Sequence, residues 1–503
     1  MSSISLDFTS FHNVINGELR SSTTGKTRST MNPAILEDNP PVPIAGLDNV
    51  DEAVQSARKA AKAWSQVLWE ERRKALNAFA DAVEVNLEGF AQMLVKELGK
   101  PVNLARIEVT IAIQSIRVLS GFSLPEQVRE DSESRKVITR YTPLGVAAGI
   151  IPWNFPISVA CVKTASALAT GNAIILKPSP HAPYGVLKLA ELGQQFFPPG
   201  VLQALSGDDE LGPWLVQHPD INVIAFTGSI GVGKKVMEGC SKTLKRCILE
   251  LGGNDAAIVC SDVDVEAITP KLGYFAFANC GQVCIIPKRI YAHESIYDKL
   301  LAGLVNYAKN LSFKLDEELA IGPLSNKPQY ERIKQLLADI ETNKLTLATG
   351  STKPLADQKG LYLTPTIIDN PLDKSRVVVE EAFGPVLPVL KWSEESDVIE
   401  RVNDTKYGLG ASVWSRDAEQ ADRIARQLEA GIVFINTHAE TDANFPAGAF
   451  KESGIGVQYG SWCIPLELEA DIRGRPLQIS TTPLSEDRTP HLEPQTPAKE
   501  GMK

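Results

Sequence analysis

Between residues 145 and 262 the chain repeats one pattern, a short apolar run followed by a longer stretch of helical character. A strand that is apolar on both faces has to be covered by helices on both sides. Strand and helix alternating at this spacing therefore predict a parallel, doubly wound α/β sheet. The apolar runs, cut by Gly and Pro, are "GVAAGIIP" (145–152), "NAIILKPS" (172–179), "VLQALSG" (201–207), "INVIAFTGS" (221–229) and "AAIVCSD" (256–262).

The rest of the chain adds a helical region, a second alternating series and a polar end. Residues 51–120 place Ala and Lys at the spacing of amphipathic helices. After about residue 253, apolar runs such as "RIYAHES" and "PVLPVLKW" alternate again with other segments, which predicts a second α/β domain. Residues 479–503 are polar and rich in Pro and Thr, which is typical of a flexible tail.

Composition argues against several classes of protein. The formal charge of −10 and the pI near 5.4 argue against a nucleic-acid-binding protein, which usually carries a basic surface. Seven irregularly spaced cysteines in 503 residues favour a reducing compartment over a secreted disulfide framework. The N-terminus lacks the apolar core of a signal peptide, and no apolar run approaches the roughly 18 residues of a membrane span. We expect a cytoplasmic protein without membrane or nucleic-acid partners.

The stretch "FTGSIGVGKK" (226–235) resembles a P-loop, with Gly228, Gly233 and Lys234 at the required spacing. A P-loop needs Ser or Thr next, to bind magnesium, and Lys235 has no hydroxyl group. A nucleotide triphosphatase is therefore not predicted. A Gly-rich turn between a strand and a helix still presents backbone N–H groups to a phosphate.

Two cysteines lie four residues apart in "FANCGQVCIIPKRI" (277–290), Cys280 and Cys284. A thiol becomes nucleophilic when backbone N–H groups or a positive charge such as Lys288 stabilise its thiolate. Both cysteines being small buried hydrophobes is the alternative, and it is the commoner fate of free Cys. A metal site is not expected, because only His293 is a further ligand close in sequence.

Three polar residues stand at the ends of apolar runs. Glu250 precedes a Gly–Gly pair, and burial there would suit a general base or a structural ion pair. Asn154 lies between Pro152 and Pro156 and is a candidate oxyanion donor, with a satisfied turn Asn as the alternative. Lys177 ends another run, at the strand edge where open α/β sheets bind ligands.

Taken together, these stretches resemble the aldehyde dehydrogenase superfamily from about residue 12 to 472. The motifs are "PWNFP", "LKPS", "FTGS", "ELGGND", "GQVC", "EEAFGPV" and "KESGIG", in the family's order. The resemblance implies a Rossmann-like NAD(P)-binding domain, a catalytic α/β domain and a small bridging sheet for homodimers or homotetramers. By position it implies an NAD(P)-binding domain in residues 1–120 and 141–252, a catalytic domain in 253–456, bridging segments in 121–140 and 457–478, and the tail in 479–503.

The resemblance also implies roles for individual residues. Cys284 resembles the nucleophile, Glu250 the base that activates the deacylating water, and Asn154 the oxyanion donor. Lys177, which completes this catalytic set, matches the lysine at the cofactor ribose. The residues that match cofactor-binding positions are Trp153, Lys177, Gly228, Ser229, Gly233, Leu251, Glu381 and Phe383.

The sequence departs from the family pattern at the cofactor ribose. Many relatives carry Glu after "KPS", where it favours NAD, and this chain has Pro180. No Arg or Lys stands in the adjacent "SPHAP" stretch, so NAD is the predicted cofactor and NADP the alternative.

Other departures concern the substrate side. Ala447 and Ala449 stand where the family usually has Phe and Gly, in the "FPAGAFKESG" loop. The end of the bridging segment, "PLELEADI", also differs from the family pattern. Val159 and Val162 stand where large side chains often flank the substrate tunnel, which predicts room for a bulky or aromatic aldehyde. The sequence of residues 176–215 resembles a microbial, fungal branch of the family. Some members of that branch act on polyketide-derived aldehydes.

Two rival interpretations share the fold. A CoA-acylating aldehyde dehydrogenase needs no water-activating Glu, so Glu250 argues against it. A non-enzymatic structural protein would have no need of Cys284 and Glu250 together. The sequence therefore predicts an NAD(P)-dependent aldehyde dehydrogenase that hydrolyses a thioester.

Overall fold

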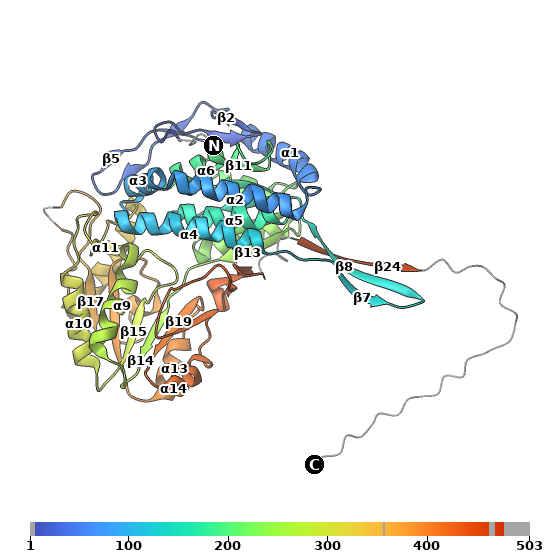
Figure 1. Cartoon of the computed structure of the whole chain (residues 1–503). Coiled ribbons are helices and arrows are strands. Elements are labelled where there is room, and N and C mark those ends of the chain that lie inside the picture. Colours follow the sequence, from blue (N-terminus) through green and yellow to red (C-terminus); the bar gives the residue numbers. More distant parts are fainter. Residues whose placement is uncertain (1–5, 356–357, 462–467, 477–503) are drawn as a thin grey trace, which may run out of the picture. The chain divides into compact units, whose positions relative to one another are not determined.

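The computed structural model of the chain describes residues 6–355, 358–461 and 468–476 (Figure 1). The chain divides into two compact units. The larger unit contains residues 1–124 and 141–469, and the smaller contains residues 125–140 and 470–503.

The first large sheet takes seven of its eight strands from residues 13–250, within the segments expected to form the NAD(P)-binding domain, and its eighth, β22 (Gly454–Ile455), from the segment expected to be catalytic. Its strands run in the order β2 (Glu18–Arg20), β1 (Asn13–Ile15), β11 (Leu202–Ala204), β10 (Ala173–Lys177), β9 (Val146–Ile150), β12 (Val223–Thr227), β13 (Arg246–Glu250) and β22 (Gly454–Ile455). The five strands from β11 to β13 are parallel. The chain builds outward from β9 to β11 and then returns to place β12 on the other side of β9. The sheet therefore has a switch point between β9 and β12, where ligands bind at the carboxyl ends.

Helices cover both faces of this sheet, because its strands are apolar on both sides. They are α1 (Leu47–Trp64), α2 (Trp69–Val85), α3 (Leu87–Leu98), α4 (Val102–Gly121), α5 (Pro156–Ala169), α6 (Tyr184–Gly193), α7 (Leu211–Gln217) and α8 (Ile230–Ser241). Helices α2, α4 and α5 lie side by side in Figure 1. Alternate residues of β10 contact the two layers. Ile174 and Leu176 pack in the core with α2 to α6, while Ala173 and Ile175 pack with α1, α7 and α8.

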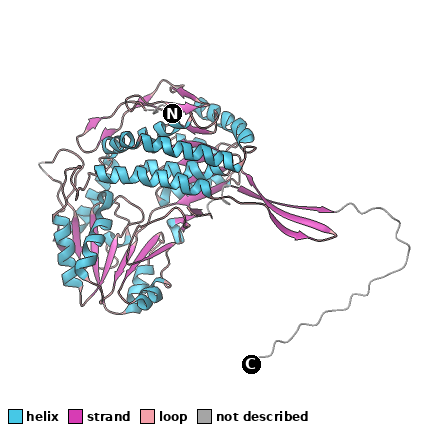
Figure 2. Cartoon of the chain, viewed as in Figure 1, coloured by secondary structure: helices cyan, strands magenta, loops and turns pink. Residues whose placement is uncertain are grey.

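The second large sheet is also mainly parallel and is covered by helices (Figure 2). Its strands run in the order β16 (Leu347–Thr349), β17 (Thr366–Asp369), β18 (Val386–Trp392), β15 (Arg289–His293), β14 (Ala256–Val259), β19 (Gly410–Trp414) and β20 (Ile432–Ile435), with only β16 antiparallel. The apolar run 256–262 thus starts this second sheet. The associated helices are α9 (Val265–Phe277), the 3-10 turn Ala278–Gly281, α10 (Tyr297–Lys309), α11 (Lys327–Thr342), α12 (Arg376–Val379), α13 (Glu395–Asn403) and α14 (Ala418–Ala425).

Short strands complete the described chain. Three two-stranded sheets pair β3 (Thr27–Arg28) with β6 (Val42–Pro43), β4 (Met31–Asn32) with β5 (Glu37–Asp38), and β21 (Ala447–Gly448) with β23 (Val457–Gln458). A three-stranded sheet has the order β24 (Leu468–Pro476), β8 (Arg135–Pro143), β7 (Gln127–Asp131). Its strands come from the two segments expected to bridge subunits, whose role stays a prediction. The tail 479–503 lies outside the described residues.

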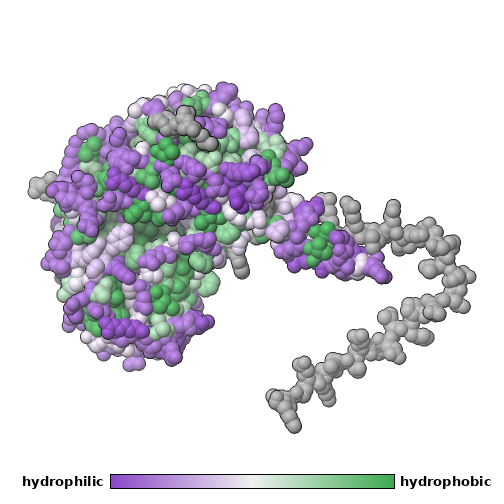
Figure 3. All heavy atoms as spheres, in the orientation of Figure 1, coloured by the Kyte–Doolittle hydropathy of each residue, from purple (hydrophilic) through white to green (hydrophobic). Residues whose placement is uncertain are grey.

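Figure 3 shows one face of the molecule, on which hydrophilic residues alternate with patches of hydrophobic residues. Among the described residues, no helix is both long and apolar enough to cross a membrane.

Candidate active site

A cavity lies where loops of the two large sheets meet. The first sheet contributes the turns that follow β9, β12 and β13, and the second contributes the loops that precede β15 and β18, with two residues of α11. The lining residues are Pro152, Trp153, Asn154, Thr227, Gly228, Ser229, Leu251, Gly252, Cys284, Gln329, Arg332, Glu381 and Phe383. Most residues singled out from the sequence are therefore together, whereas Lys177, Gly233 and Glu250 lie outside the lining.

Cys284 is half-buried in the loop between the 3-10 turn and β15. Burial raises the pKa of its thiol above the usual range. The carboxylates of Glu250, Glu381 and Asp255 raise that pKa further. The ammonium group of Lys288 acts in the opposite direction. The surroundings thus favour the protonated thiol in the ligand-free protein.

An unusual backbone aims this loop into the cavity. Asn279, Cys280 and Gly281 all have left-handed φ angles, of 50°, 58° and 72°. A Cβ on Gly281 would lie 2.1 Å from the carbonyl oxygen of Gly384, so only glycine fits there. The Cys280 side chain is 1% exposed, and burial raises its pKa. Cys280 is a buried thiol, as the alternative interpretation had it, and only Cys284 faces the cavity.

Asn154 lies directly beside the Cys284 loop. Its Nδ2 donates to the carbonyl oxygen of Gln282 at 3.0 Å, which leaves its second N–H for another acceptor. The backbone carbonyl oxygen of Asn154 accepts from Lys100 Nζ at 2.8 Å and from Asn279 Nδ2 at 3.4 Å. Hydrogen bonds therefore hold both the side chain and the backbone of Asn154.

A buried ion pair supports Asn154, and sequence reasoning missed it. Lys100 and Glu108 pair with both side chains fully buried. Glu108 Oε1 also accepts from the backbone N–H of Ile157 at 2.9 Å, at the start of α5. The signal in the sequence is that Glu108 interrupts the apolar face of the helix over residues 102–121. A buried carboxylate on an apolar face requires a partner.

Glu250 ends β13, with its carboxylate turned toward β23. Thr227 Oγ1 donates to Glu250 Oε2 at 3.3 Å. With the Gln458 amide oriented so that both its polar atoms are paired, its nitrogen donates to Glu250 Oε2 at 2.7 Å and its oxygen accepts from Lys163 Nζ at 2.9 Å. Burial raises the pKa of Glu250, while Lys163 and Thr227 act against that rise. A carboxylate with a raised pKa is a stronger base than an ordinary one, which suits a group that accepts a proton from water.

The turn after β12 presents the start of α8. Ser229 is the N-cap, and its Oγ accepts from Val232 N at 3.4 Å. A Cβ on Gly231 would meet nothing within 4 Å, so the first turn of the helix borders open space. Gly233 has a packing role instead, since a Cβ there would lie 2.5 Å from Leu251. Lys234 is exposed and pairs with Glu452 at 2.7 Å.

Lys177 ends β10 at the same edge and is 6% exposed. Its Nζ makes one long hydrogen bond, 3.3 Å to the carbonyl oxygen of Pro178. Burial lowers the pKa of Lys177 to about 8, and Asp209 acts against that fall. Arg28 is close enough to lower the pKa of both Lys177 and His181. Arg28 therefore supplies, near Lys177, the additional positive charge that the "SPHAP" stretch (179–183) lacks.

The loop before β18 carries Glu381 and Phe383. Glu381 Oε1 accepts from Gly253 N at 3.2 Å. Arg332 of α11 donates to the Glu381 carbonyl at 2.5 Å, which fixes the backbone of this loop. The Phe383 ring contacts Trp153 edge to face at 5.4 Å.

These residues fit a dinucleotide. A helix start with bordering space and Lys177, whose Nζ makes one long hydrogen bond among the described residues, lie at the carboxyl edge of the first sheet, which has the switch point. The second sheet contributes Glu381 to the cavity lining. A phosphate suits the helix start, and ribose hydroxyls suit the lysine and the carboxylate.

Comparisons with known proteins show the family of this chain. The profile of the Aldehyde dehydrogenase family matches residues 20–467. Aldehyde dehydrogenase LUC3 of a Fusarium species is 41% identical over 457 residues, which cover 90% of this chain and 96% of that protein. Phenylacetaldehyde dehydrogenase of Pseudomonas fluorescens is 34% identical over 473 residues, covering 90% of this chain and 93% of that protein.

A solved structure gives the same result for the fold. The NAD+ complex of an aldehyde dehydrogenase from Bacillus cereus superposes with a TM-score of 0.90 at 33% identity, covering 93% of this chain and 97% of that one. The family match spans the five parallel strands of the first sheet, the whole second sheet and all the cavity-lining residues. The chain belongs to the aldehyde dehydrogenase family.

Proposed function

We propose that this chain, an NAD(P)-dependent aldehyde dehydrogenase by family, oxidises an aldehyde to the carboxylic acid through Cys284. The observation that carries the proposal is the position of Cys284. Its thiol faces the cavity from the second sheet, opposite Asn154 and the turn that begins α8 on the first sheet. A nucleophile, an oxyanion donor and a phosphate-binding turn thus border one space.

The chain's own residues account for the chemical steps. The Cys284 thiolate attacks the aldehyde carbon, and the Asn154 amide with the backbone N–H of Cys284 stabilises the oxygen anion of the thiohemiacetal. NAD(P), when bound, would supply the acceptor for the hydride that leaves the thiohemiacetal carbon, and Lys177, Glu381 and Phe383 would hold it. Glu250 then takes a proton from water, the hydroxide attacks the thioester that remains on Cys284, and the acid leaves as the Cys284 thiolate is restored.

NAD is the proposed cofactor, because the similar Bacillus cereus aldehyde dehydrogenase was solved as an NAD+ complex. NADP is the alternative, because Pro180 provides no carboxylate to exclude a 2′-phosphate and Arg28 lies near Lys177 and His181. The ratio of kcat/KM with the two cofactors decides between them.

We propose a bulky or aromatic aldehyde as substrate, with a polyketide-derived aldehyde as one member of that class. Val159 is half-buried and Ala447 is small, whereas Val162 is 2% exposed and belongs to the core. The relative that acts on phenylacetaldehyde supports an aromatic substrate. A panel of aldehydes tests this, and a preference for acetaldehyde would contradict it.

We also propose a cytoplasmic homodimer or homotetramer. Among the described residues, strand β20 at the end of the second sheet pairs only with β19, and Ile435 on it is 41% exposed. An unpaired strand edge is a surface to which another chain can add. Light scattering of the purified protein measures the assembly.

The decisive experiment replaces the nucleophile. Cys284→Ala abolishes aldehyde-dependent formation of NAD(P)H, because no other thiol faces the cavity among the described residues. Cys280→Ala is the matched control and retains most of the activity. Near-normal turnover by a folded Cys284→Ala protein would exclude the proposal.

A further inference from the structure

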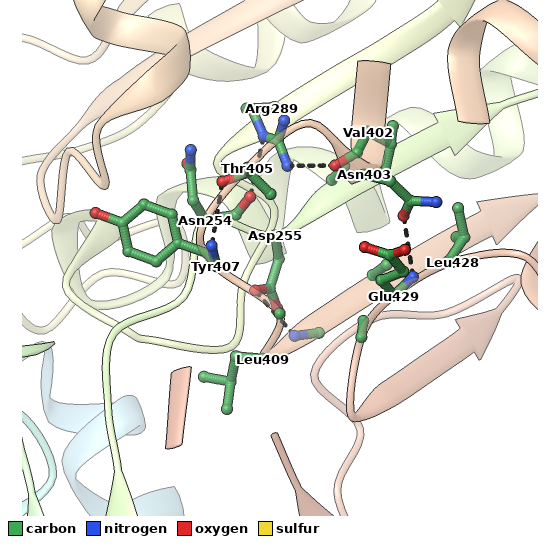
Figure 4. Close-up of a pocket in the computed structure, with 15 residues that line it drawn as sticks. Asn254, Asp255, Arg289, Val402, Asn403, Thr405, Tyr407, Leu409, Leu428 and Glu429 are labelled. Carbon is green, nitrogen blue, oxygen red and sulfur yellow. Dashed lines mark hydrogen bonds between the residues drawn. The ribbon is translucent and has the colours of Figure 1, made fainter. Parts of the chain in front are cut away.

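Lys288 is a buried lysine for which the mechanism above has no use. It is 3% exposed and lies four residues after Cys284. Its backbone N–H donates to the Asp255 carbonyl at 2.8 Å. Figure 4 shows the next residue, Arg289, fixed by hydrogen bonds to the carbonyl oxygens of Asn254 and Val402, at 3.0 and 3.3 Å. These hydrogen bonds fix the backbone at Lys288, and with it the point from which the Lys288 side chain extends.

The ammonium group of Lys288 contacts both loops that the second sheet sends to the cavity. Its Nζ donates to the carbonyl oxygen of Gly281 at 2.5 Å, in the left-handed turn before Cys284. The same Nζ lies 5.1 Å from the centre of the Phe383 ring, in the loop that carries Glu381. A cation over an aromatic face is attracted to it. One side chain thus links the thiol loop to the loop that faces the cofactor edge.

The charges around the thiol are mostly negative. Carboxylates come from three elements, Glu250 at the end of β13, Asp255 before β14 and Glu381 before β18. Lys288 is the cation that acts on Cys284, and Arg332 of α11 acts on Lys288 and Glu381. Without a positive charge, a thiolate here would face three carboxylates in a poorly solvated cavity.

Burial alters the two charged neighbours as well. It lowers the pKa of Lys288 to about 8, and the carboxylates of Glu381 and Asp255 act against that fall. It raises the pKa of Glu381 to about 7, which Lys288 opposes. Each group thus stabilises the charged form of the other.

We propose that Lys288 is a positioning residue that holds the Gly281 carbonyl and supplies the positive charge against which Cys284 ionises. This inference rests on the proposed role of Cys284 as nucleophile. The proton of the thiol passes to solvent, and the thiolate that remains is balanced by the Lys288 ammonium group. Lys288 acts through Cys284 and does not touch the reacting carbon.

The test measures the thiolate directly, without turnover. In the cofactor-free, full-length protein, the rate of Cys284 alkylation by iodoacetamide is followed by mass spectrometry of the peptide that contains it. Lys288→Met removes the charge and keeps the apolar stem, so we expect alkylation at neutral pH to slow about tenfold, equivalent to about one unit in the thiol pKa. Lys288→Arg retains the charge and should restore most of the rate. Lys391→Met, at an exposed lysine of β18, is the control and leaves the rate unchanged.

A second variant is expected to change the rate of Cys284 alkylation in the opposite direction. Glu250→Gln removes the carboxylate that raises the thiol pKa most but keeps an oxygen for the Thr227 hydroxyl, so alkylation should become faster. This variant leaves Lys288 and its partner Glu381 in place and tests the charge balance even where Lys288→Met does not fold. An unchanged rate in folded Lys288→Met, or a rate that falls in Glu250→Gln, would overturn the inference. The proposed function fails separately, if Cys284→Ala keeps its turnover.

Discussion

The two large sheets meet the cavity with opposite ends of their strands. The first sheet presents carboxyl ends, so Asn154, Ser229 and Glu250 follow or end β9, β12 and β13. The second sheet presents amino ends, so Cys284 precedes β15 and Glu381 precedes β18. Ligand sites at carboxyl ends are the rule for open parallel sheets. Here the second sheet supplies the proposed nucleophile from the amino ends of its strands, which this rule does not cover.

The loops at the carboxyl ends of the first sheet and those at the amino ends of the second sheet are built differently. Residues of the first sheet leave a strand through a short turn fixed by proline or by a helix cap, as at Pro152 and Ser229. The loops of the second sheet depend on left-handed residues, such as Gly281 and Phe383, and on a buried cation. A turn at a strand end is thus largely set by local sequence, while these loops depend on groups from distant segments.

The largest expected effect comes from a change at the first sheet. Glu250→Gln removes the proposed base, and general-base catalysis contributes about 10²–10⁴-fold. Steady-state turnover should fall by that factor, while one equivalent of NAD(P)H still forms rapidly because Cys284 is intact. Stopped-flow absorbance distinguishes the fast first turnover from the slow steady state. Loss of that first turnover would instead place Glu250 in the first half of the reaction.

The same residue predicts a pH dependence. The pKa of Glu250 is raised by burial, so the carboxylate that accepts a proton becomes fully populated only above the usual carboxyl range. Thioester hydrolysis should therefore slow as pH falls through this raised pKa. In Glu250→Gln this acidic limb should disappear. A limb that persists unchanged would assign it to another group.

Sequence reasoning succeeded best where local sequence determines structure. The five apolar runs between residues 145 and 262 all contain observed strands, and the family and its fold are confirmed. The cavity brings together Asn154, Ser229, Cys284 and Glu381, as their motifs suggested, although their roles stay predictions.

What the sequence did not show depends on contacts between distant segments. Lys100 reaches the Asn154 carbonyl across 54 positions of sequence. Arg28 approaches Lys177 from a short strand near the N-terminus, so the cation missing from "SPHAP" is supplied elsewhere. Gln458, from β23, binds the Glu250 carboxylate. None of these pairings has a periodicity or a motif, because each depends on how the sheets pack.

A pair of glycines sharpens the comparison between the two ends. Gly281→Ala puts a Cβ against the Gly384 carbonyl at a φ of 72°, where the left-handed backbone alone costs about 1–2 kcal/mol. We expect a lower melting temperature and a loss of turnover of about 10²-fold, as the thiol loop shifts. Gly231→Ala, beside the first sheet, meets no atom within 4 Å and should gain about 0.5–1 kcal/mol in helix stability. Thermal unfolding of both variants checks this, and equal destabilisation would mean that the two ends are equally constrained.

The smallest expected effect concerns Lys177 at the carboxyl edge of the first sheet, and it tests whether this residue acts only in cofactor binding. Lys177→Gln removes a charge-assisted hydrogen bond to the cofactor, so KM for the cofactor should rise about tenfold with kcat nearly unchanged. Because burial lowers the pKa of Lys177 to about 8, the wild-type lysine loses its charge above that pH. The cofactor KM should therefore rise above about pH 8 in the wild type and stay flat in Lys177→Gln. Lys234→Gln, at the exposed lysine paired with Glu452, is the control and should leave KM unchanged. A fall in kcat with an unaltered KM would assign Lys177 to the chemistry instead of to cofactor binding.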